Sequence, residues 1–85
     1  MRRALVAESA NWVSVPPPEP GAAFDCAIKI RSAGDPVPGV RATALPGGGF
    51  RADFPAGIAG VAPGQSAVLY DGDAVLGGGF IREAE

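Results

Sequence analysis

Few side chains in this sequence can carry out covalent or acid–base chemistry. The 85 residues include no histidine and one cysteine, Cys26. Without histidine there is no imidazole to act as a general base or a metal ligand, and one cysteine forms neither a zinc site nor a dithiol pair. Cys26 lies in an alternating apolar segment, where a free cysteine behaves as a small hydrophobic side chain. The sequence therefore predicts no catalytic residue and no metal site.

Asp71 and Asp73 are the two carboxylates that come nearest to a cation site. They flank Gly72 and stand between two apolar runs. Two carboxylates supply too few oxygen ligands for a calcium loop. An Asp-Gly pair between apolar runs is a strong signal for a hairpin. We interpret this segment as a turn.

Three consecutive glycines, residues 77–79, raise the possibility of a phosphate-binding loop. Such a loop needs a following helix and usually a lysine with a serine or threonine. The segment that follows is "FIRE", which is typical of a strand. The glycines instead predict a sharp bend or a close approach of backbone to another strand.

Three basic side chains form a candidate stripe: Lys29 and Arg31 on one face of a strand, and Arg41 facing outward from the next. One interpretation is a solvated surface, and the other is a small phosphate-contacting patch. The formal net charge is −2. Because free-standing nucleic-acid binders usually carry a basic excess, we expect any RNA contact by this chain alone to be weak or local.

Apolar residues alternate with polar ones in short segments, which is the period of half-buried strands. These segments are 3–8, 24–31, 40–45, 50–54, 65–70, 74–77 and 79–83. Residues 16–21, "PPPEPG", predict an extended connection or, alternatively, a proline-rich ligand, and residues 55–64 a loop anchored by Ile58 and Val61. The pattern favours an all-β barrel or sandwich of six or seven strands, and barrel closure would remove exposed edges.

The composition fits one small domain that spans residues 1–85, with 47% apolar residues. No apolar run is long enough for a membrane helix, and the N-terminus lacks the apolar core of a signal peptide. A single cysteine is typical of a reducing compartment. We expect a soluble, cytoplasmic protein with no membrane contact.

Five segments together resemble one family. They are "NWVS" (11–14), "CAIKIR" (26–31), "PVP" (36–38), "APGQSAVLYDGD" (62–73) and "VLGGGFI" (75–81). Their order and spacing resemble the C-terminal domain of bacterial tRNA-specific 2-thiouridylases (tRNA-uridine 2-sulfurtransferases), most specifically from residue 63 to 81. The resemblance implies a small six- to seven-stranded antiparallel β-barrel like the second domain of elongation factor Tu.

The resemblance also implies a role in tRNA modification. Enzymes of this family use ATP and Mg to activate the wobble uridine and transfer sulfur to its C2 from a cysteine persulfide. Their Ser-Gly-Gly-Val-Asp-Ser nucleotide loop and both catalytic cysteines are absent here, and Cys26 matches a barrel position that is not catalytic. The chain is thus expected to lack activity and cofactors of its own, with tRNA and the family's N-terminal and central domains as partners.

The family's barrel contacts tRNA at two places. One is the dipeptide after "KI", here Arg31-Ser32 beside Lys29, and the other is the glutamine of "PGQ", here Gln65. Ser32 departs from the aromatic residue often found there, which removes a stacking surface for a base. Two alternatives stay open. The chain is a structural interdomain module with an apolar patch around Trp12 or Phe80, or a free-standing barrel with another ligand in a large apolar pocket.

Overall fold

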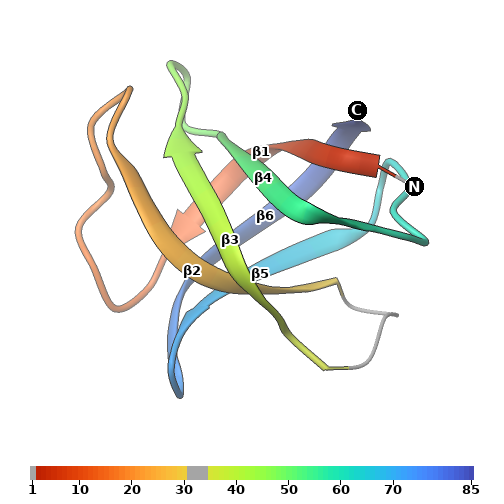
Figure 1. The fold of residues 1–85 in the computed structure, drawn as a ribbon. Helices are drawn as coiled ribbons and strands as arrows, with labels where there is room; N and C mark the ends of the chain where they lie inside the picture. The colour runs from red at the N-terminus through yellow and green to blue at the C-terminus, as the bar shows by residue number, and fades with distance from the viewer. Residues whose placement is uncertain (1, 31–34) are drawn as a thin grey trace.

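The structure is a computed structural model that describes residues 2–30 and 35–85. These residues form six strands: β1 (Arg2–Trp12), β2 (Ala23–Ile30), β3 (Val37–Ala44), β4 (Phe50–Ile58), β5 (Ser66–Asp71) and β6 (Ala74–Ala84). The strands close into an antiparallel barrel in the order β1-β4-β3-β2-β5-β6 (Figure 1). This confirms the predicted antiparallel barrel. No helix in the described ranges is long and apolar enough to cross a membrane.

The alternating residues predicted to face inward do line the core. Ile28, Ile30 and Val40 are at most 1% exposed, as are Phe50 and Leu69. Trp12 closes the core from the end of β1, where its ring meets those of Phe24 and Phe50 edge to face at centroid distances of 6.1 and 6.2 Å. Such pairs contribute about 0.5–1.5 kcal/mol each beyond the area they bury.

Three strands are longer than the sequence predicted, and one of them, β3, begins at Val37 and not at residue 40. β1 continues from residue 8 to Trp12, and β4 continues through the expected loop to Ile58. The register of β1 against β4 shifts between Ala4 and Arg2, which pairs with Ile58. Gly57 has a φ of 76°, which accommodates this irregularity. Only residues 59–65 therefore connect β4 to β5.

The glycine run lies inside one continuous strand, so the barrel has six strands and not seven. A Cβ built on Gly77 would lie 2.5 Å from the carbonyl oxygen of Asn11 in β1, and one on Gly78 would lie 2.7 Å from that of Ala67 in β5. On Gly79 it would lie 2.8 Å from the carbonyl oxygen of Glu8. The predicted close backbone approach is confirmed on both sides of β6.

The predicted hairpin is also confirmed. Asp71 pairs with Ala74, so Gly72 and Asp73 form a two-residue loop between β5 and β6. Gly72 has a φ of 58°, and a positive φ at the first loop residue is the position where a type II′ turn needs glycine.

Cys26 is 8% exposed and belongs to the core cluster, as expected. Burial, helped by the nearby charges of Asp25 and Asp71, raises the pKa of the Cys26 thiol from 9.0 to about 11. A neutral, enclosed thiol is a poor nucleophile, because the thiolate is the reactive form. The expectation that Cys26 is a structural residue is consistent with this environment.

We predict that Gly78→Ala destabilises the barrel, because its Cβ would meet the backbone of β5. The expected loss is about 1–3 kcal/mol of unfolding free energy in urea denaturation. Gly47→Asn is the control. Gly47 occupies the third position of a Leu45–Gly48 turn with a φ of 89° and open space beyond its Cα, and asparagine tolerates this conformation. A Gly78 variant as stable as the control would contradict the close approach.

The Cys26 pKa predicts a specific alkaline loss of stability. Below pH 9.0 the thiol is neutral in both states, whereas between pH 9.0 and about 11 it ionises only in the unfolded chain. Stability should fall across that window by up to about 2–3 kcal/mol. Urea denaturation from pH 8 to 11 should show this slope in the natural chain and lose it in Cys26→Ala. If the unfolding free energy fell equally with pH in the natural chain and in Cys26→Ala, that result would contradict the raised pKa.

Candidate nucleic-acid interface

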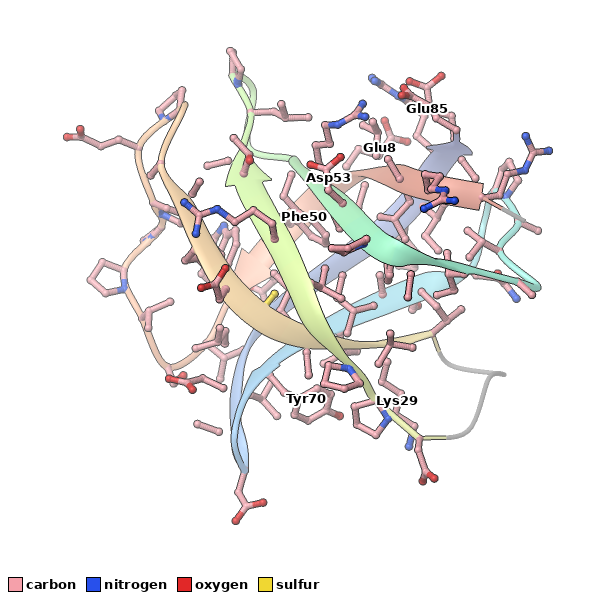
Figure 2. All side chains as sticks on the ribbon, in the orientation of Figure 1. Glu8, Lys29, Phe50, Asp53, Tyr70 and Glu85 are labelled. Carbon is pink, nitrogen blue, oxygen red and sulfur yellow. The ribbon has the colours of Figure 1, made fainter. Side chains whose placement is uncertain are left out.

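The end of β2 and the start of β5 lie side by side in the barrel (Figure 1). Lys29 pairs with Val68, and Ile30 pairs with Ala67, two residues beyond Gln65. The strand spacings place the Cα atoms of Lys29 and Gln65 roughly 10–12 Å apart. The structure therefore brings these two predicted residues to one region, and Figure 2 shows Lys29 near the end of β2. Arg31 and Ser32, which follow Ile30 in sequence, lie outside the described residues.

Gln65 has a structural task in this region. Its side-chain Oε1 accepts a hydrogen bond from the backbone N–H of Ala62 at 2.8 Å. The backbone N–H of Gln65 donates a second hydrogen bond to the Ala62 carbonyl at 3.3 Å. The N–H of Ile81 in β6 donates to the Gln65 carbonyl at 2.7 Å. The "PGQ" segment is thus a turn held to β6, and Gln65 is fixed where β5 begins.

Arg41 faces outward from β3, as predicted, but its charge is countered. Its Nη1 lies 3.0 Å from Oδ1 of Asp25. Asp25 of β2, Arg41 of β3 and Asp53 of β4 are neighbours in one row across the sheet. The basic stripe inferred from sequence therefore ends at this row, because the cation sits between two carboxylates.

A second ionic group continues this charged face. Arg51 binds Oδ1 of Asp53 through Nε at 3.2 Å and Oε1 of Glu85 through Nη1 at 2.7 Å. The hydrogen bond that Arg51 donates to Glu85, with smaller contributions from Asp53, raises the pKa of Arg51. Figure 2 labels Asp53 and Glu85 close together at this surface. The sequence analysis did not identify this group, since residues 34 positions apart meet here only through the barrel register.

The two carboxylates of the β5–β6 hairpin do not belong to a metal cluster. Asp71 and Asp73 are exposed at the turn. Residues 2–30 and 35–85 contain no group of three or more histidine, cysteine or acidic side chains that could hold a metal ion. The two-residue loop between the paired residues Asp71 and Ala74 is the turn that the Asp-Gly pair indicates.

Comparison with known proteins places the barrel in a family. A family described as the aminomethyltransferase beta-barrel domain matches residues 2–81. The chain is 45% identical over 80 residues to the tRNA-specific 2-thiouridylase MnmA of Idiomarina loihiensis, covering 93% of this chain and 20% of that protein. It is 42% identical over 85 residues to the enzyme of the same name from Delftia acidovorans, covering 100% of this chain and 22% of the relative.

A more distant relative gives the same alignment. The tRNA-specific 2-thiouridylase MnmA of Chloroflexus aggregans is 37% identical over 84 residues, which cover 99% of this chain and 23% of the relative. The chain thus spans about one fifth of the length of the curated relatives it matches, and it corresponds to their C-terminal part. The resemblance to the C-terminal domain of 2-thiouridylases is confirmed by these matches and by the closed six-stranded barrel. The chain belongs to the aminomethyltransferase β-barrel domain family, in the branch found in tRNA-specific 2-thiouridylases.

Proposed function

We propose that this chain is the tRNA-contacting barrel of a 2-thiouridylase, the enzyme that transfers sulfur to C2 of the wobble uridine. The observation that supports this most is the juxtaposition of Lys29, at the end of β2, with Gln65, at the start of β5. The family resemblance implies that these two segments carry tRNA contacts. In the proposal Lys29 and Arg31 meet phosphates, while Gln65 and Ser32 hydrogen-bond to sugar or backbone.

The charge distribution supports a local contact of modest strength. The cations Arg41 and Arg51 are paired with carboxylates, which leaves them little attraction for phosphate. With a net charge of −2 the barrel as a whole does not attract RNA. Recognition by the barrel is then a supplement to binding by the rest of the enzyme.

In this proposal the sulfur-transfer reaction takes place outside the barrel. Cys26 is enclosed in the barrel with a pKa of about 11, so its environment does not favour the thiolate that a persulfide carrier needs. ATP, Mg and the sulfur-transfer step would belong to the parts of the 2-thiouridylase outside this barrel. The barrel's contribution is to hold the tRNA.

We predict that Lys29→Ala and Arg31→Ala each weaken tRNA binding by roughly 1–2 kcal/mol, because each removes one phosphate contact. NMR titration of the labelled chain with unmodified tRNA at low salt measures the affinity. Arg41→Ala is the matched control, since it removes the same charge from an outward position already paired with Asp25. The proposal fails if all three variants bind tRNA alike, or if the chain's tRNA shifts persist unchanged at high salt.

Variants of Gln65 separate its structural task from its proposed RNA contact. Gln65→Ala removes the acceptor for the Ala62 N–H and should cost about 1 kcal/mol of stability as well as tRNA affinity. Gln65→Glu keeps an acceptor oxygen for the Ala62 N–H, and its carboxylate repels the RNA backbone, so its tRNA affinity should fall. Thermal melts and tRNA titrations of both variants test this. Equal tRNA affinity of Gln65→Glu and the natural chain would exclude RNA contact at this residue.

A further inference from the structure

An open groove of about 310 Å³ runs over β6 and its neighbours β1 and β5 on the outside of the barrel. Its largest lining side chains are apolar, from Val13, Val68, Val75 and Phe80, and the polar residues Ser9, Asn11 and Ser66 also line it. Its floor is the glycine run 77–79, where the backbones of β1 and β5 leave no room for a Cβ. The groove is therefore built into the barrel closure and does not depend on side-chain positions at its floor.

Three of the four large apolar residues that are exposed in the described ranges line the groove. Val13 is 65% exposed, Phe80 55% and Val75 37%. The other large exposed apolar residue in the described ranges, Val15, is outside the groove. Clustered exposed apolar side chains mark interaction sites. Of the two positions where an apolar patch was expected, Phe80 lines this groove, whereas Trp12, whose ring meets Phe24 and Phe50, lines a separate pocket with Val15.

The chemistry of the lining selects the kind of occupant. None of the residues that line the groove is charged, so it offers no cation to a phosphate backbone. All three strands beneath it are paired on both sides in the closed barrel, so a partner cannot add a strand to an open edge. The occupant that fits is a protein surface that inserts apolar side chains.

The comparisons indicate where such a surface would come from. The relatives carry about four fifths of their length outside the region that matches this barrel. We propose that the groove formed by Val13, Val68, Val75 and Phe80 docks apolar side chains from that remaining part of a 2-thiouridylase. This docking rests on the family membership and does not require the barrel to bind RNA.

The groove adjoins the candidate RNA contact. Lys29, Val68, Gly78 and Asn11 are successive cross-strand neighbours from β2 to β1. Lys29 therefore lies two strand spacings, roughly 10 Å, from the groove floor. A partner seated in the groove would have Lys29 at its border, and tRNA would be held along the seam between the barrel and the partner.

The test uses the ¹⁵N-labelled chain and, as probe, the part of the Idiomarina loihiensis enzyme outside the aligned 80 residues. Amide shifts are expected at residues 77–79 and at Val68 on addition of the probe. Val75→Ser should weaken binding at least tenfold. Val15→Ser is the matched control, since both valines are 37% exposed and only Val75 lines the groove. The control should bind like the natural chain.

A chimera tests the same contact without relying on the probe to fold alone. In it, this chain replaces the aligned segment of the relative, and p-benzoylphenylalanine replaces Val75 or, as control, Val15. Photo-crosslinks to the remainder of the enzyme are expected from position 75 and not from position 15. Equal crosslinking from both positions, or none from position 75, would overturn the proposal.

Other occupants of the groove give distinct results in the same experiments. Groove shifts that grow with the concentration of the chain alone would assign the groove to a second copy. Groove shifts caused by tRNA alone would assign it to RNA. Either result would overturn docking of the enzyme's remainder. Loss of binding in Val75→Ser with unchanged tRNA titration at Lys29 would support docking independently of the proposed RNA contact.

Discussion

The closure of this barrel depends on how closely β6 can approach its two neighbours. At Gly77 and Gly79 its backbone lies against carbonyl oxygens of β1, and at Gly78 against one of β5. A larger residue at these positions would push β1 or β5 away and weaken its pairing with β6. The enclosed core, including Cys26 with its neutral thiol, exists because this approach is possible. The same three glycines also line the apolar groove.

The outer surface is divided into regions of different chemistry. Across β2, β3 and β4, opposite charges alternate from Asp25 through Arg41 to Asp53, and this face neutralises itself. Exposed pairs of this kind add little stability, and their effect is mainly to keep the face hydrated and without net attraction for a partner. The groove beside β6 carries no charge, and Lys29 lies between these two faces. A partner and an RNA backbone would therefore be drawn to adjoining but different parts of the barrel.

Sequence patterns predicted the inward faces of β2 and β3 and the β5–β6 hairpin, because alternation and turn chemistry are local properties. They did not predict that β4 continues past Pro55, since Pro-Ala-Gly is typical of a loop, whereas here Gly57 permits a bulge. The ion pair of Arg41 with Asp25 could not be predicted from the sequence for a different reason. Which residue lies opposite another is decided by barrel register, and register depends on the whole sheet. The position of Gln65 followed from the family resemblance, but its hydrogen bond to Ala62 required the geometry of the turn.

An acidic barrel can contribute to tRNA binding without binding RNA by itself if its contact forms only in the assembled enzyme. A strongly basic barrel would bind any RNA by itself, since phosphate neutralisation is independent of sequence. A barrel with a net charge of −2 has too little attraction to do so. In the proposed arrangement, docking through the groove would add the barrel's weak contact to those of its partner at high effective concentration. Selectivity would then come from requiring both surfaces at once, which is possible because the groove and Lys29 lie only two strands apart.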